Sequence, residues 1–207
     1  THHDLAIMLP KINPYMRPIG TSVEEWCNEK ISEMEETILS IGPDQIGCFI
    51  AEPILASGGV IVPPPGYHQR SLELCKKHDI VYISDETVTG FGRLGHWFAS
   101  KEIFGIQPDI ITCAKGLTSG YLPMGAAIIS ESLIDSIKNK DGSQPFTNGY
   151  TYSCHPVAAK AALTNIDIMS RDGILEHVRK ISPYFQNRLR DLGKKYDIIG
   201  DARGVGL

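Results

Sequence analysis

The sequence lacks paired cysteine spacings, an excess of basic residues and any long apolar run. Its five cysteines are odd in number and scattered without a CxxC pair, which argues against a disulfide framework and against a zinc site. The formal net charge of -4 provides no basic surface for nucleic acid. No segment approaches the roughly 20 apolar residues of a membrane-spanning helix. We therefore expect a cytoplasmic protein that acts on small molecules and binds neither nucleic acid nor membranes.

The sequence does contain alternating helical and strand-like segments. Amphipathic spacing over residues 22–42, with Ser22 and Glu25 at capping-box positions, predicts a first helix. Continuous apolar runs of strand length lie within "IGCFIAEPI", "IVYISDE", "DIITC" and "MGAAIIS". Further helices are predicted over residues 69–78, 131–139, 156–170 and 173–196, and a polar loop over 140–156.

Apolar strands separated by helices predict an α/β fold. We expect a three-layer sandwich with a mostly parallel sheet covered on both faces. The 207 residues suffice for one large domain. The final segment, "DIIGDARGVGL", has the composition of the entry to another strand, so the architecture is expected to be cut short at both ends.

Polar residues follow several of the predicted strands. They are Glu52, then Asp85 with Glu86, then Lys115, and then Thr151, Ser153 and His155. Ligands of open parallel sheets bind at the carboxyl ends of the strands. An isolated aspartate at such an end most often caps a turn, and an isolated lysine is most often solvated. Together, however, Asp85 and a desolvated Lys115 match the two anchors of a pyridoxal phosphate ring, namely aspartate on the pyridine nitrogen and lysine on the aldehyde carbon.

Four motifs in the observed order and spacing carry a family resemblance. "AEPI", "SDETVTGFGR", "PDIITCAKGLTSGYLPMGA" and "GYTYSCHP" resemble the class III aminotransferases, the ω-amino-acid type of fold-type-I enzymes that use pyridoxal 5'-phosphate (PLP). The resemblance covers essentially the whole chain. It implies ping-pong transfer of an amino group from an amine or ω-amino acid to a keto acid such as pyruvate, through a lysine Schiff base. An aminomutase, decarboxylase or racemase of the same family, or a catalytically incomplete fragment, stays open.

The resemblance also implies a role for each of five residues. Lys115 would carry the Schiff base and move the proton, and Asp85 would hold the pyridine nitrogen protonated. Thr87 occupies the position that packs on the ring face, where the family usually has an aliphatic residue. Thr151 would bind the phosphate of the partner subunit's cofactor, which implies a homodimer with shared sites. Glu52 resembles the glutamate that pairs with a mobile arginine at the substrate pocket.

Further expectations concern a local strain, the domains and metals. Cys154 stands where the family favours glycine, so a positive φ at this residue would be strained.

The resemblance places 1–195 in the large cofactor-binding domain and 196–207 at the start of the C-terminal small domain. The whole protein would be roughly twice to two and a half times as long. His96 and His155 have no second ligand at metal spacing, so no metal is expected.

Overall fold

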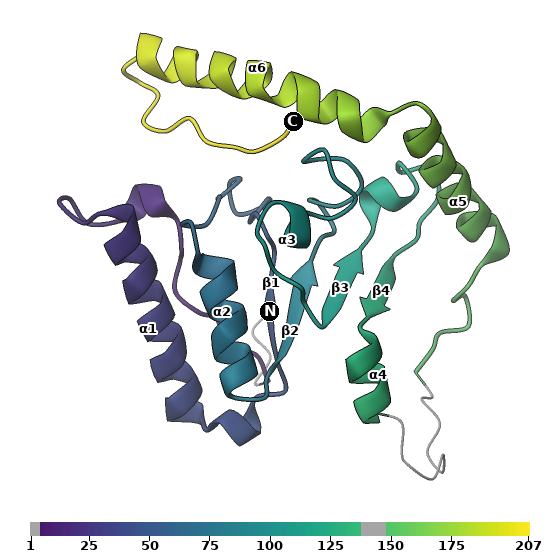
Figure 1. Ribbon diagram of the computed structural model, residues 1–207, viewed down its shortest axis with the longest axis horizontal. Coiled ribbons are helices and arrows are strands. Elements are labelled where there is room, and N and C mark those ends of the chain that lie inside the picture. Colours follow the sequence, from purple (N-terminus) through teal and green to yellow (C-terminus); the bar gives the residue numbers. More distant parts are fainter. Residues whose placement is uncertain (1–4, 138–147) are drawn as a thin grey trace.

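The computed structural model describes residues 5–137 and 148–207 (Figure 1). It confirms the α/β fold with a mostly parallel sheet, whose strands lie in the order β1-β2-β3-β4. The strands are β1 (Cys48–Ala51), β2 (Val81–Asp85), β3 (Ile110–Cys113) and β4 (Ala126–Ile129). β1, β2 and β3 are parallel to one another, and β4 is antiparallel to β3.

The direction of β4 is consistent with the lack of a crossover helix between it and β3. Residues 114–125 contain only the 3-10 turn η3 (Lys115–Leu117). A parallel pair requires a crossover of about a dozen residues or more, usually through a helix, whereas an antiparallel pair does not. The chain therefore turns back at Lys115 and places a loop at the carboxyl end of β3.

Six α-helices lie within the described ranges. They are α1 (Val23–Ile41), α2 (Tyr67–Lys77), α3 (Ala99–Glu102), α4 (Glu131–Ile137), α5 (Pro156–Arg171) and α6 (Ile174–Lys195), with short 3-10 turns η1 (Pro14–Met16) and η2 (Pro43–Gln45). The capping box of α1 forms as predicted: the Glu25 N–H donates to Ser22 Oγ at 3.1 Å, and the Ser22 N–H donates to Glu25 Oε2 at 2.7 Å. None of the helices that the structure describes has the length and apolar character needed to cross a membrane.

Two boundaries differ from the prediction. Helix α2 begins two residues early, because Gly66, with φ +84°, turns the chain into the helix at Tyr67. The strand predicted within 197–207 is wrong: the described residues 196–207 contain no strand. Among the described residues the segment contacts a helix, since Gln186 Nε2 of α6 donates to the Gly206 carbonyl at 2.8 Å. The predicted loop 140–156 lies partly outside the described residues.

Two apolar clusters lie against the same face of the sheet. Met34 of α1 and Cys75 of α2 pack with Tyr82 of β2 in the main cluster, and helix α5 packs over Cys113 in another. The opposite face carries one isoleucine from each strand in register, and the most exposed of the four is 57% exposed. We call this set the isoleucine row; its members are Ile50, Ile83, Ile110 and Ile129. At the carboxyl ends of the strands, this face leads to Asp85.

Candidate active site

Asp85 is the last residue of β2 and lies on the sheet face of the isoleucine row. Its Oδ1 accepts a hydrogen bond from the Thr87 N–H at 3.0 Å, so the carboxylate caps the turn that follows the strand. Burial acts most strongly on Asp85 and favours its neutral form. Hydrogen bonds from Thr87 and from the Thr112 hydroxyl, together with the charge of Lys115, outweigh burial and hold the pKa of Asp85 below its usual value. The carboxylate is therefore ionised at neutral pH.

Lys115 begins η3, one residue after the end of β3, with Ala114 between them. Its φ is +40°, a left-handed conformation that residues other than glycine seldom adopt. Lys115 is exposed among the described residues, which do not enclose it, so a desolvated amine stays a prediction for the whole protein. The charge of Lys115 nevertheless stabilises the ionised form of Asp85. The structure thus brings the predicted cation and the predicted anion together at the ends of neighbouring strands.

Thr87 and Glu52 lie at the same edge of the sheet. Thr87 is half-buried; its N–H donates to Asp85, and its side chain also helps to lower the pKa of Asp85. Glu52 directly follows β1, and its Oε2 accepts from the Ala56 N–H at 3.1 Å. Since Ala51 and Ser84 are register partners, continuing the register by one residue pairs Glu52 with Asp85. Both residues therefore border the same region as Lys115.

Thr151 is not brought to this edge. It is exposed in the turn 151–154, where the Ser153 N–H donates to the Tyr150 carbonyl at 2.9 Å. Within the described residues, no hydrogen bond or ion pair joins Thr151 to Asp85 or Lys115. In the same turn, Cys154 has φ +58°, the positive value at which its side chain is strained.

Glu86 has a structural role that its sequence position did not indicate. It follows Asp85 and is fully buried, whereas Asp85 is only partly buried. Its carboxylate accepts four hydrogen bonds from Thr89, Ala99 and Ser100. The only sequence signal for this arrangement was an acidic residue next to a strand end. Ala99 and Ser100 donate through backbone N–H groups and come close to Glu86 only when the chain folds.

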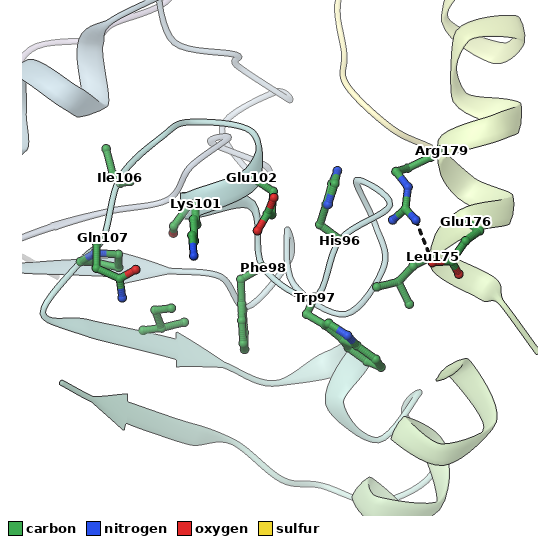
Figure 2. Close-up of a pocket in the computed structure, with 13 residues that line it drawn as sticks. His96, Trp97, Phe98, Lys101, Glu102, Ile106, Gln107, Leu175, Glu176 and Arg179 are labelled. Carbon is green, nitrogen blue, oxygen red and sulfur yellow. Dashed lines mark hydrogen bonds and ion pairs between the residues drawn. The ribbon is translucent and has the colours of Figure 1, made fainter. Parts of the chain in front are cut away.

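A cavity of about 390 Å³ lies away from Asp85 and Lys115, with Ser100 in its wall. Figure 2 shows it between the loop that carries His96 and Trp97, helix α3 and the start of α6, with Arg179 hydrogen-bonded to Glu176. None of the predicted site residues lines it. Ile111 forms part of its wall, on the sheet face opposite to that of Asp85. The cavity is therefore separate from the candidate active site.

Comparison with known proteins identifies the family. The family model described as "Aminotransferase class-III" matches residues 2–207. The chain belongs to the class-III aminotransferases. This class-III chain is 44% identical over 183 residues to the putrescine–pyruvate aminotransferase of Pseudomonas aeruginosa, covering 88% of the chain and 38% of that protein. It is 42% identical to the mitochondrial γ-aminobutyrate transaminase 1 of Oryza sativa, covering 91% of the chain and 36% of that protein.

Solved structures give the same family and point to the cofactor. The ω-transaminase of Pseudomonas jessenii in complex with PMP superposes with a TM-score of 0.88 at 36% identity, covering 95% of the class-III chain and 44% of that structure. Class-III aminotransferases depend on PLP. The chain spans less than half the length of these relatives.

The donor set of this class-III chain suits PLP. The ring nitrogen of PLP requires an anion to hold it protonated, and its aldehyde requires a primary amine. Asp85 is an ionised carboxylate and Lys115 is an exposed amine, and the two come from adjacent strands. The residues present therefore fit this cofactor.

Proposed function

We propose that the whole protein is a PLP-dependent aminotransferase that moves an amino group from an amine or ω-amino acid to a keto acid such as pyruvate. The observation that supports it most directly is the electrostatic coupling of Asp85 to Lys115 at adjacent strand ends. The similarity to a putrescine–pyruvate aminotransferase and to γ-aminobutyrate transaminases supports the substrate class.

Asp85 would act on the ring nitrogen. When bound, PLP supplies an electron sink for the carbon that loses its proton. An ionised Asp85 keeps a proton on the ring nitrogen, which is the state in which the ring withdraws electrons most strongly. Thr87 holds the Asp85 carboxylate through its N–H, and its branched side chain would lie along the ring face.

Lys115 would have two tasks. Its Nζ would hold the cofactor covalently, and the same Nζ, once displaced by the substrate amine, would carry the proton between the substrate carbon and the cofactor carbon. The positive φ of Lys115 starts the turn η3 and lets the following residue, Gly116, pack against Phe91. The backbone next to Lys115 is therefore held against the loop that contains Phe91.

Glu52 would contact the substrate. It lies at the edge next to Asp85, and its carboxylate already accepts a hydrogen bond from the Ala56 N–H. A carboxylate here can receive the second amino group of a diamine, or it can pair with a basic residue when the substrate carries its own carboxylate. This alternation would allow one site to accept the amine and then the keto acid, as a ping-pong reaction requires.

Release of product from one substrate tests the reaction type. The whole protein loaded with PLP and given putrescine or γ-aminobutyrate, without a keto acid, should release one equivalent of carbonyl product per site and then stop. Adding pyruvate should restart turnover and form alanine. Continuous turnover without a keto acid, or release of carbon dioxide, would instead indicate an aminomutase or a decarboxylase.

We further propose a homodimer in which Thr151 serves the partner's site. Thr151 is exposed and is not joined to Lys115 in its own chain, and the tyrosines on either side of it, Tyr150 and Tyr152, are 81% and 85% exposed. Exposed aromatic side chains of this kind favour an interface. Thr151 would then donate its hydroxyl and N–H to the cofactor phosphate of the partner.

Subunit mixing tests this arrangement. Lys115→Ala and Thr151→Ala proteins should each have low activity. A hybrid dimer would contain one site with both substitutions and one intact site, so random reassociation should restore about a quarter of wild-type activity. No recovery, with hybrid dimers shown by mass spectrometry, would mean that Thr151 serves its own subunit.

Two coarser proposals concern domain and location. We propose that residues 1–195 belong to the large cofactor-binding domain, since α6 ends at Lys195, and that 196–207 lead into the small domain. We also propose a cytoplasmic location, which the five free cysteines support. Limited proteolysis of the whole protein should cut near residue 196 if the domain boundary lies there.

A further inference from the structure

Glu86 sits at the centre of a closed hydrogen-bond network next to the candidate active site. Its Oε2 accepts from the Thr89 hydroxyl at 2.6 Å and the Ala99 N–H at 2.8 Å. Its Oε1 accepts from the N–H and the hydroxyl of Ser100, at 2.7 and 2.5 Å. A carboxylate suits these four donors, because both of its oxygens accept and neither has to donate. Hydrogen bonds to a charged acceptor are about twice as strong as neutral ones.

These bonds join both ends of the loop 86–100. The Gly90 N–H donates to the Glu86 carbonyl at 2.9 Å, which closes the first turn. At the other end, the Ser100 and Ser84 hydroxyls are 2.8 Å apart, and since Ser100 donates to Glu86, Ser84 is the donor of this pair. The start of α3 is therefore fixed to β2 one residue before Asp85. We call this set of bonds the Glu86 clamp.

The clamped loop also reaches the lysine. A Cβ on Gly116 would lie 2.8 Å from Phe91 Cβ and 3.5 Å from the Gly90 carbonyl oxygen, so the loop packs directly against the residue that follows Lys115. The Phe91 N–H donates to the Trp97 carbonyl at 2.8 Å, which holds this part of the loop in place. A shift of the loop would therefore press on the backbone of Lys115.

We propose that Glu86 is a positioning residue for the reaction: it sets the distance between Asp85 and Lys115 by fixing the loop that borders both. The inference rests on the proposed PLP chemistry. Glu86 is the first residue of that loop and the chain neighbour of Asp85, and the same loop packs against Gly116. A buried carboxylate elsewhere in the core would affect only stability, whereas this one also controls the geometry of the two cofactor anchors.

Glu86→Gln in the whole protein tests the proposal. Glutamine keeps the size of the side chain but replaces one acceptor oxygen with an NH2 group. This group donates, and it would face other donors without an acceptor. We expect the midpoint pH of the visible absorbance band of bound PLP to shift by about one unit. We also expect kcat per bound PLP to fall about 100-fold, as displacement of reacting groups by about 1 Å does. Glu86→Asp, which restores the charge, should recover part of both effects.

Met34→Ala provides a stability control. Met34 is buried between α1 and α2 and lies outside the site, and its truncation leaves a cavity in the core. It should lower the melting temperature without moving the midpoint pH of the band. If Glu86→Gln also lowers only the melting temperature and leaves the midpoint pH and kcat within twofold of wild type, the proposal is overturned.

Two further outcomes are informative. If Glu86→Gln does not fold, Thr89→Val removes a single donor from the clamp and should shift the midpoint pH in the same direction by a smaller amount; an unchanged midpoint in this folded variant overturns the proposal. If the wild-type protein itself shows no PLP band that depends on Lys115, the proposed function fails, and this inference fails with it. That failure is recognised because the wild type, and not only the variant, lacks the band.

Discussion

Asp85 and Thr112 are register partners across the parallel strands β2 and β3, and both lie on the sheet face of the isoleucine row. The Thr112 hydroxyl is one of the groups that, against the opposing effect of burial, lower the pKa of Asp85. The strand pairing itself therefore helps to keep the proposed ring-nitrogen partner ionised.

Thr112→Val should destabilise the protein more at neutral pH than in acid. Because the pKa of folded Asp85 is lowered, its contribution to stability is present above the unfolded value of about 3.9 and is lost as the pH falls through the folded value. We expect a loss of about 0.5–1 kcal/mol at pH 7, since Asp85 is only partly buried, and a smaller loss at pH 3. Urea unfolding at the two pH values measures it.

Thr37→Val is the matched control for that measurement. Its hydroxyl donates to the Glu33 carbonyl on α1 at 2.7 Å and touches no carboxylate. The loss in this variant should therefore be similar at pH 7 and pH 3. An equal loss at both pH values in Thr112→Val as well would show that Thr112 does not stabilise the ionised form of Asp85.

Asp85→Asn should lower the rate of proton transfer from substrate by about 10²–10⁴-fold, because asparagine cannot hold a proton on the ring nitrogen by charge. Stopped-flow absorbance with an amine donor alone measures this step. Asp109→Asn is the control, since Asp109 Oδ2 accepts from the Tyr82 N–H at 2.8 Å, before β3 and away from its carboxyl end. Asp109→Asn should reduce stability and leave the rate per bound cofactor within a few-fold of wild type.

His68 should make the protein less stable as the pH falls below about 6.5. It is buried, with Nε2 3.0 Å from the Pro53 carbonyl and Nδ1 2.9 Å from the Tyr82 hydroxyl. Nε2 therefore donates to the carbonyl, Nδ1 accepts from Tyr82, and the ring is neutral. Burial, the largest effect, lowers the pKa of folded His68, so the unfolded chain binds a proton at a higher pH than the folded protein does. Below about pH 6.5, the free energy of unfolding therefore falls by up to about 1.4 kcal/mol per pH unit.

His68→Gln should reduce this pH dependence. The slope of unfolding free energy between pH 6.5 and 5 should be smaller than in the wild type, while His177→Gln, at an exposed position of α6, should leave it unchanged. Equal slopes in the His68 variant and the wild type would mean that His68 is protonated in the folded protein.

Gly206→Ala should destabilise the protein more than Gly20→Ala. Both glycines have positive φ, +77° and +90°, which costs an alanine about 1 kcal/mol. A Cβ at Gly206 would also collide with the Arg93 carbonyl oxygen and lie 2.8 Å from Leu94 Cα, whereas a Cβ at Gly20 meets nothing within 4 Å. We expect a further loss of about 1–3 kcal/mol at Gly206, measured by thermal unfolding; equal losses would place the 196–207 segment away from Arg93.

The strands and the residues directly after them could be predicted from the sequence. The ends of β2 and β3 are visible as apolar runs followed by Asp85 and Lys115, because both signals are local. The direction of β4 was less accessible, since it depends on the lack of a crossover helix in residues 114–125. The strand expected after residue 196 does not form among the described residues, where this segment contacts α6 through the bond from Gln186 to the Gly206 carbonyl.

The role of Glu86 could not be predicted, for a different physical reason. Its donors at Ala99 and Ser100 are more than ten residues away in the chain, and they approach it only after the loop has folded. The exposure of Lys115 was likewise hidden, because burial depends on which segments cover a residue and not on the strand that precedes it. The sequence therefore predicted which residues carry the charges at the strand ends, but it did not predict the long-range contacts that position them.

The role of Lys115 is tested most directly by the absorbance of the whole protein with PLP. The wild type should show a visible band of bound PLP that disappears when an amine donor is added and returns with a keto acid. Lys115→Ala should lack this band although it folds and still binds PLP through Asp85. A band of wild-type position and intensity in purified Lys115→Ala would contradict the assignment of Lys115 as the residue that holds the cofactor.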